Sequence, residues 1–392
     1  MASGISRLAA IAAAGAMALA AATAVAEDSV KVGVVGPMTG PLAVMGKQWR
    51  QGIEAYMAAH GDTVNGHKIE VIYRDTTANP SMARQLTQDL VVRDGVQALI
   101  GYGISPSAAA AAPVINQAKI PAFLPHAASP GLMAASPYFA RMGQNIATNA
   151  EVAADWALKK GVKTAYIAVA DYAPGHDVAK AFQPAFEAGG GKVVGQDNIP
   201  LSTVDFSPFA ERIATADPDM VQMFIPPGAQ AVSMVKALAA RGVMADTLVI
   251  GQGEAEDSDI HLFDGTIDNF HTVIYYSQSL DNPENKTFLD SLKATAGADV
   301  LPSSFTLGAY DAMGLIYALV ADMKGDRIDG PAAMEALAGH SWNSPRGKVT
   351  LDMQTREPIQ DFVVRQVQQT DAGLRNVVID TIPQVTPKPT TN

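Results

Sequence analysis

The chain has 392 residues, no cysteine and a formal net charge of −11. The lack of cysteine excludes disulfides, thiolate metal sites and thiol nucleophiles, and the acidic balance disfavours nucleic acid and anionic membranes as partners. With 48% hydrophobic and 17% charged residues, the chain can form a large core, and its length favours two domains.

The first 26 residues have the features of a secretory signal peptide. Arg7 precedes the apolar run LAAIAAAGAMALAAA, and residues 24–26 (AVA) form a small-x-small cleavage site before Glu27 and Asp28. A single membrane anchor is the alternative. We expect cleavage after Ala26, export into a bacterial periplasm and no membrane insertion afterwards. No other stretch approaches the roughly 20 apolar residues that span a bilayer.

From Val30 onward, strand-like and helix-like segments alternate along the chain. The first run predicts strands at 30–35, 67–75, 97–101 and 121–125, with helices at 43–59, 81–93 and 106–118. After Gly143 the alternation restarts, with helices at 146–160, 177–188, 206–216 and 229–241 and strands at 164–170, 192–199, 220–225 and 247–251. Two runs of β-α-β alternation predict an α/β fold with two parallel sheets and helices on both faces.

The last third of the chain contains fewer strands. We expect strands at 270–276, 347–352 and 360–367 and helices at 284–295, 304–323 and 331–338. Because these strands are too few for a third sheet, the segment is expected to return to both earlier units. The simplest architecture is a two-lobed protein that the chain crosses several times.

Several possible motifs are weak. The stretch GPLAVMGKQ (40–48) resembles a phosphate loop, but five residues separate its glycines and Gln48 follows Lys47, so nucleotide binding is disfavoured. None of the seven histidines has metalloprotease spacing. Asp257, Asp259 and His261 could touch a cation, although a solvated acidic helix start is the favoured interpretation. We expect no metal and no cofactor.

The stretch LPHAASPGL (124–132) could be catalytic or could bind a ligand. His126 with Ser129 or Ser105 could form a hydrolase site, but the orienting carboxylate that such a site needs is not evident, so we do not expect an enzyme. The alternative rests on position, because ligands bind beyond the carboxyl ends of parallel strands. Both 101–107 and 125–130 follow such strands.

These two loops suit a carboxylate ligand. A helix is expected to begin near Pro106, so its first N–H groups and partial positive charge can hold an anion. Ser105 and Ser129 add hydroxyl groups, His126 is a candidate donor, and the small Ala127 and Ala128 let a ligand approach the backbone closely.

With these residues in place, the chain resembles the periplasmic leucine/isoleucine/valine-binding proteins. These are solute-binding components of branched-chain amino-acid type ABC transporters. The resemblance covers about residues 29 to 380 and rests on VKVGVVGPMTGPLAVMG, VNGHKIEVIYRD, ALIG, IPAFLP, AASP, DYAPGHDVAKAF, DFSPFAERI and TLGAYDAM in this order.

The resemblance implies the periplasmic binding protein type I fold, a Venus-flytrap of two Rossmann-like lobes joined by a three-segment hinge. It places lobe 1 at 27–143 plus 277–353, lobe 2 at 144–276 plus 354–386, and a tail at 387–392. The crossings are expected near Gly143–Asn145, Tyr276–Ser279 and Asp352–Arg356. Ligand contacts in both lobes would stabilise a closed state.

The family binds the ligand carboxylate with a serine at the position of Ser105 and with backbone groups of the loop 126–128. Other positions depart from the family pattern. Ala128 stands where relatives commonly have Thr, and Pro174 stands where they have Tyr, with Tyr172 two residues earlier. The acidic residue that receives an α-ammonium falls near Gly253 and Glu254. The expected aromatic residues are replaced by Met45 and Pro226.

The carboxylate half of the site is therefore retained, and the ammonium half is eroded. The sequence predicts a small apolar or aromatic carboxylate without an α-ammonium. The candidates for the apolar walls are Tyr102, Tyr172, Met45 and Phe206, and the alternative for each is a place in the core. Branched-chain amino acids remain the alternative, with Glu254 receiving the ammonium. The resemblance implies ABC transporter permease subunits as partners, and a ligand-presenting sensor is the alternative role.

Overall fold

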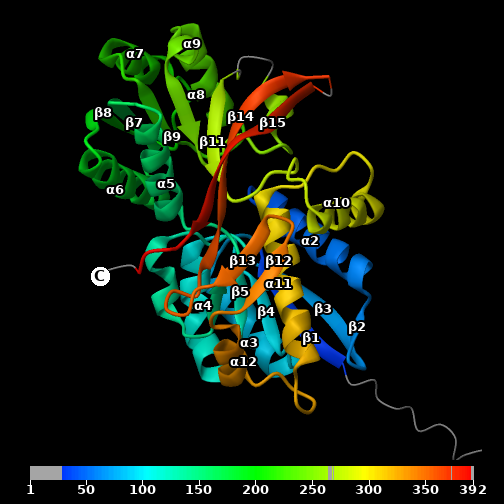
Figure 1. Ribbon diagram of the computed structural model, residues 1–392. Helices are drawn as coiled ribbons and strands as arrows, with labels where there is room; N and C mark the ends of the chain where they lie inside the picture. Colours follow the sequence, from blue (N-terminus) through cyan, green and yellow to red (C-terminus); the bar gives the residue numbers. More distant parts are fainter. Residues whose placement is uncertain (1–28, 264–266, 268, 372, 390–392) are drawn as a thin grey trace, which may run out of the picture.

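Figure 1 shows an upper and a lower half, each with helices around a β-sheet, and a hairpin of the upper sheet, residues 341–351, lies in the lower half. The computed structural model describes residues 29–263, 267, 269–371 and 373–389. The first sheet has the strand order β2-β3-β1-β4-β5-β6, parallel except for the β2–β3 hairpin. Its strands are β1 (Ser29–Gly36), β2 (Thr63–Val64), β3 (His67–Asp75), β4 (Ala98–Gly101), β5 (Ala122–Leu124) and β6 (Phe139–Arg141).

The second sheet has a parallel centre with antiparallel strands on one side. Its order is β12-β13-β14-β11-β10-β9-β7-β8, and β15 pairs with β14. The strands are β7 (Thr164–Ala170), β8 (Lys192–Ile199), β9 (Met220–Phe224), β10 (Leu248–Gly251), β11 (Phe270–Ile274), β12 (Ser341–Ser344), β13 (Gly347–Leu351), β14 (Pro358–Thr370) and β15 (Gly373–Val385). The predicted α/β class with two mainly parallel sheets is confirmed.

Helices cover both faces of each sheet because strand residues alternate between two cores. In the first sheet, Val34 and Ile100 pack toward α2 and α11, whereas Val35 and Leu99 pack toward α3 and α4. The helices are α2 (Ala43–His60), α3 (Pro80–Asp89), α4 (Ser105–Ala118), α5 (Ile146–Lys159), α6 (Ala173–Ala188), α7 (Ser207–Ala216), α8 (Ala229–Ala240), α9 (Val243–Asp246), α10 (Pro283–Ala296), α11 (Ser304–Ala321) and α12 (Gly330–Leu337).

A glycine allows α2 and α11 to cross closely. A Cβ atom on Gly52 would lie 2.1 Å from the carbonyl oxygen of Thr306, so a larger residue would push the two helices apart. The same end of α11 is fixed by a capping box between Ser303 and Thr306. The position of the first turn of α11, which carries Ser304 and Phe305, is therefore set by both contacts.

Three segments connect the structural units around the two sheet cores, and the third joins two strands of the same sheet, of which β13 packs on the core of the first sheet. The connecting segments are 142–145 between β6 and α5, 275–282 between β11 and α10, and 352–357 between β13 and β14. The three predicted crossings fall within these segments. The β12–β13 hairpin pairs with β14, yet Trp342 and Leu351 pack into the core of the first sheet. The lobe limits stay a prediction.

Several predicted elements differ from the observed ones. Helix α3 ends at Asp89, where a π-helical turn, Leu90–Asp94, replaces the predicted continuation to residue 93. Helix α6 begins at Ala173 rather than 177, because Pro174 occupies its first turn. The sequence prediction missed β2, β6, β12 and β15, and β14 is longer than expected. Three of these four, β2, β6 and β12, have at most four residues, too few to show a period.

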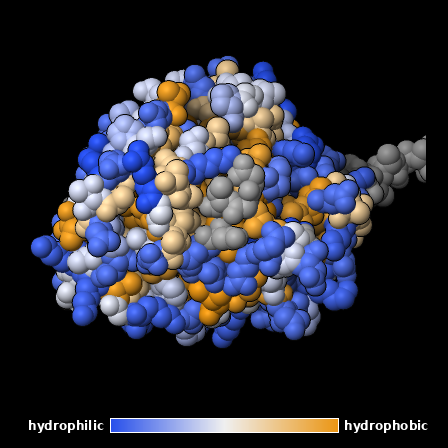
Figure 2. All heavy atoms as spheres, turned by 90° about the horizontal axis from the view of Figure 1, so that it is seen from above, coloured by the Kyte–Doolittle hydropathy of each residue, from blue (hydrophilic) through white to orange (hydrophobic). Residues whose placement is uncertain are grey.

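Within the described residues, one helix is long and apolar enough to cross a membrane. This is α11, with a mean hydropathy of 1.3, so the expectation that no stretch after residue 26 approaches such a span was wrong. Because 78% of α11 is buried inside the protein, it is a core helix here. The face shown in Figure 2 is largely hydrophilic, with apolar residues in separate areas. The predicted signal peptide and the end of the tail lie outside the described residues.

Candidate functional site

Two loops that follow neighbouring parallel strands of the first sheet meet at their small polar residues. Strand β4 is followed by residues 102–104 and the start of α4, and β5 is followed by residues 125–129. The backbone N–H of Ser129 donates to Oγ of Ser105 at 3.1 Å. Ser105 lies in the first turn of α4, with Ile104 at the N-cap. The structure therefore brings together Ser105 and Ser129, as the position of the loops suggested.

A buried arginine holds the 126–129 loop in place. The Arg141 guanidinium, at the end of β6, donates to the carbonyl oxygens of Ala127 and Ser129, the latter at 2.8 Å. It also forms an ion pair of 2.9 Å with Glu357, and Asn145 donates to the other carboxylate oxygen of Glu357 at 2.9 Å. One cluster thus connects the loop to two of the three crossing segments.

His126 is a neutral side chain at the edge of this cluster. Its ring contacts that of Phe305 edge-on, with 4.2 Å between centroids. Burial and the nearby Arg141 charge lower the pKa of His126 to about 4, so the imidazole is uncharged at neutral pH. Within the described residues no hydrogen bond joins His126 to Ser105 or Ser129. His126 can therefore donate a hydrogen bond without forming a serine–histidine pair.

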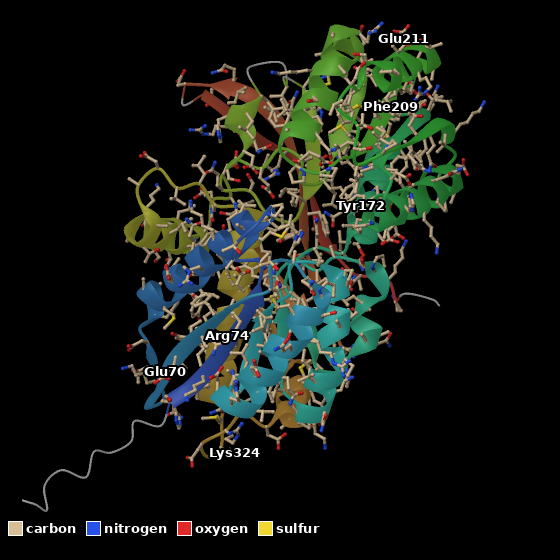
Figure 3. All side chains as sticks on the ribbon, turned by 180° about the vertical axis from the view of Figure 1, so that it is seen from behind. Glu70, Arg74, Tyr172, Phe209, Glu211 and Lys324 are labelled. Carbon is tan, nitrogen blue, oxygen red and sulfur yellow. The ribbon has the colours of Figure 1, made fainter. Side chains whose placement is uncertain are left out.

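Apolar side chains accompany these loops on both sheets. The sulfur of Met45 would lie 3.3 Å from a Cβ atom on Gly103, so Met45 borders the loop after β4. Tyr172 stacks on Phe224, with ring centroids 6.2 Å apart. Figure 3 places Tyr172 on the part of the second sheet's unit nearest the first sheet. The sequence prediction missed Phe224 and Phe305, which it had treated as ordinary strand and helix positions.

The predicted residues of the second sheet follow the ends of three of its strands. Tyr172 comes after β7, Pro226 after β9 and Glu254 after β10, so all three lie at one sheet edge. Pro226 and Ala128 are partly buried, and Ala128 packs against the core around α5. Burial, and then the charge of Glu254, raise the pKa of Tyr172 to about 12. The phenol therefore stays protonated and can donate.

The side-chain carboxyl of Glu254 is already hydrogen-bonded to nearby backbone N–H groups. Its side chain is buried and accepts from the N–H groups of Ile225 at 3.1 Å, Gln252 at 2.6 Å and Gly253 at 2.9 Å. Burial raises the pKa of this carboxyl, and the backbone N–H bonds oppose that rise only in part. A ligand ammonium would have to compete with these N–H donors for the carboxylate.

Two predicted wall residues lie elsewhere. The Tyr102 side chain is fully buried among α3 and α4, and its hydroxyl bonds to Oγ1 of Thr87 at 2.7 Å. Phe206 is buried in the core around α7 and α8. Tyr102 has a positive φ of 65°, so the alternation of β4 does not continue through it. For these two residues the structure favours the alternative, a place in the core, over a place in the ligand-binding walls.

Replacing Tyr102 with phenylalanine tests the assignment of this side chain to the core. The change removes the hydroxyl that bonds to Thr87, so we expect the free energy of unfolding to fall by about 1 kcal/mol. Chemical denaturation measures that loss. Ligand affinity should change less than about twofold, since the side chain lies in the core. A tenfold loss of affinity with unchanged stability would return Tyr102 to the binding surface.

The predicted solvated helix start near residue 257 is wrong for Asp257. The sequence favoured a solvated helix start, but Asp257 is buried and accepts from the backbone N–H and the side-chain amide of Asn376, both at 3.1 Å. Asp259 precedes a short 3-10 turn at Ile260–Leu262. In the part of the chain that the structure describes, no cluster of acidic or histidine residues is arranged to hold a metal ion.

Comparison with known proteins establishes the family. The family model described as periplasmic binding protein matches residues 29–373. The chain belongs to the periplasmic binding protein family. Among its relatives is the Leu/Ile/Val-binding protein homolog 6 of Brucella melitensis, 36% identical over 90% of this chain and 91% of that protein.

Solved structures of similar proteins carry aromatic acids. The solute-binding protein of an ABC transporter from Rhodopseudomonas palustris HaA2, in complex with p-hydroxybenzoic acid, has a TM-score of 0.86. It is 36% identical to this periplasmic binding protein and covers 92% of this chain and 98% of its own. The protein from strain BisB5 with 3,4-dihydroxybenzoic acid has a TM-score of 0.84 and 36% identity, covering 92% and 99% of the two chains.

Proposed function

We propose that this periplasmic binding protein captures a small aromatic or apolar carboxylate between its two lobes. The bound acid is then delivered to the permease subunits of an ABC importer. The observation that carries the proposal is the contact between Ser105 and the Ser129 backbone. It joins the first turn of α4, where N–H groups and the helix dipole favour an anion, to the loop after β5.

The preference for an acid without an ammonium rests on Glu254. Its carboxylate already accepts three backbone N–H groups, one on Oε1 and two on Oε2, so only one further acceptor site, on Oε1, remains for a buried ligand ammonium. An ammonium carries three N–H donors, and a buried ammonium that is incompletely paired typically costs several kcal/mol. The apolar body of the acid is expected against Met45, Tyr172, Phe224, Phe305 and Pro226. The solved relatives with hydroxybenzoates support this choice.

The proposal divides the chain as the sequence predicted. Lobe 1 is 27–143 plus 277–353, lobe 2 is 144–276 plus 354–386, and 387–392 form a tail. Ligand contacts to both lobes would favour the closed arrangement over the open one. The protein would act in the periplasm after cleavage at Ala26. Micromolar affinity corresponds to about −8 kcal/mol, a scale that charge-assisted hydrogen bonds and an apolar pocket can supply.

A ligand panel tests the proposal on the mature protein. Thermal shift and titration calorimetry are measured with 4-hydroxybenzoate, benzoate, leucine and valine. We expect stabilisation by the aromatic acids, because a ligand that binds only the folded state raises the midpoint of unfolding. Stabilisation by leucine or valine and by no aromatic acid would reject the proposal and favour the branched-chain alternative.

Ser105→Ala refines the same experiment. Loss of a hydrogen bond to a charged ligand typically costs about 1.5–3 kcal/mol, so affinity for 4-hydroxybenzoate should fall about tenfold or more. Ser202→Ala, on an exposed turn of the second lobe, is the matched control and should leave affinity unchanged. Equal affinity of the Ser105→Ala and Ser202→Ala variants would exclude Ser105 from the site.

A further inference from the structure

A cavity lies on the flank of the first sheet's unit. Its volume is about 210 Å³. It is bordered by α2, α11, the start of α10 and the β12–β13 hairpin. It shares no lining residue with the site described above. The residues used below are Tyr56, His60, Glu284, Tyr310, Asp311 and Trp342.

Aromatic rings form much of the cavity wall. Tyr56 stacks on His60, with ring centroids 4.2 Å apart, and meets Tyr310 edge-on at 4.8 Å. Trp342, on β12, is stacked with His340 at 6.2 Å. A Cβ atom on Gly314 would lie 3.0 Å from the Tyr56 ring, so the glycine provides the space that this ring occupies. Faces of such rings attract cations through their quadrupole.

Two carboxylates, Asp311 and Glu284, line the cavity, and the first of them is paired with an arginine. Asp311 is buried at its base and is paired with Arg346 at 2.8 Å. Glu284 is a second carboxylate of the lining and is only partly exposed. Asn282, rather than Glu284, caps α10 through its side chain. Since one arginine balances Asp311, the charge of Glu284 remains to attract a cation.

Titration behaviour of the lining residues agrees with a negative local field. Burial and then the Asp311 charge raise the pKa of Tyr56 to about 12. Burial, followed by the charges of Tyr56 and Asp311, raises the pKa of Tyr310. Burial is the main cause for both tyrosines, and only the smaller contribution of the Asp311 charge has the sign that favours a bound cation. Burial lowers the pKa of His60, so this ring carries no positive charge at neutral pH.

We propose that this cavity binds a small organic ammonium ion. The aromatic faces would surround its alkyl groups, and Glu284 would balance its charge. The charge of Glu284 disfavours an aromatic carboxylate in this cavity. The inference is independent of the proposed function, because the two sites use different residues and ligands of opposite charge.

The test uses tetramethylammonium chloride and phenethylammonium chloride as probes of the mature protein. Saturation-transfer NMR and titration are run up to about 20 mM probe, where millimolar binding is readily detected. Sodium chloride at equal ionic strength is the reference. We expect saturation transfer to at least one probe, unchanged within about twofold when 4-hydroxybenzoate is present in excess.

Variants locate the site. Glu284→Gln and Trp342→Ala should each weaken probe binding about fivefold or more, through loss of the charge and of the ring face. Glu335→Gln, an exposed carboxylate on α12, is the matched control and should have no effect. Circular dichroism verifies that each variant is folded, and Glu284→Gln alone decides if Trp342→Ala is unfolded. Failure of both probes to bind, displacement by 4-hydroxybenzoate, or equal binding by Glu284→Gln and Glu335→Gln would each overturn the proposal.

Discussion

Replacing Arg141 with methionine is expected to lower the free energy of unfolding by about 3–5 kcal/mol. The guanidinium is fully buried and pairs with Glu357, whose side chain is 4% exposed. Methionine fills similar space but leaves the Glu357 carboxylate buried without its counter-charge. It also leaves the carbonyl groups of Ala127 and Ser129 without their donor. Urea denaturation followed by circular dichroism measures the loss.

Two further variants separate charge from volume. Lys286→Met removes a cation that pairs with Asp290 on the surface of α10, where both side chains are more than half exposed. This change should alter the free energy of unfolding by less than about 1 kcal/mol. Arg141→Met combined with Glu357→Leu should recover part of the loss, because no unpaired charge then remains buried. An effect of Arg141→Met no larger than that of Lys286→Met would contradict the role assigned to this pair.

Stability should fall on acidification through His126. Its pKa is about 4 in the folded protein, below the value of 6.5 expected for an unpaired histidine. Below pH 6.5 the unfolded chain takes up a proton that the folded protein does not accept until pH 4. The unfolded state therefore gains relative stability as the pH falls through this window. A difference of this size corresponds to about 3 kcal/mol between pH 7 and pH 4.

The measurement compares the pH dependence of unfolding in the wild type and in His126→Gln. The variant cannot take up the proton, so its stability should decline less steeply between pH 6.5 and pH 4, by about 3 kcal/mol in total. His261→Gln, which alters an exposed histidine, is the control and should follow the wild type. Parallel curves for the wild type and His126→Gln would show that His126 does not carry this dependence.

Parallel strands were the most predictable part of the fold. The segments 67–75, 164–170 and 192–199 were predicted at their observed bounds. The segment 164–170 is a continuous buried apolar run, and 67–75 alternates at period 2. The edge strand β15 was missed. It contains the polar residues Arg375, Asn376 and Asp380 and Pro383, so its sequence lacks the continuous apolar run of a buried strand.

The candidate site was predictable only where neighbouring strands determine it. The carboxyl ends of β4 and β5 lie side by side in a parallel sheet, which is why Ser105 and Ser129 could be expected to meet. Arg141 and Glu357 are 216 positions apart, and no local pattern connects them. The place of the Tyr102 side chain could not be predicted for another reason. Its left-handed backbone conformation reverses the side-chain direction that strand alternation implies.

The interleaving of the chain has a consequence for the order of folding. The six strands of the first sheet are complete by Arg141, but α11, which covers one face of that sheet, begins only at Ser304. The second sheet likewise needs β14, which pairs with β11 and begins at Pro358. Neither unit can bury its full apolar surface until the C-terminal third has been synthesised. Folding of both halves is therefore coupled through the last part of the chain to leave the ribosome.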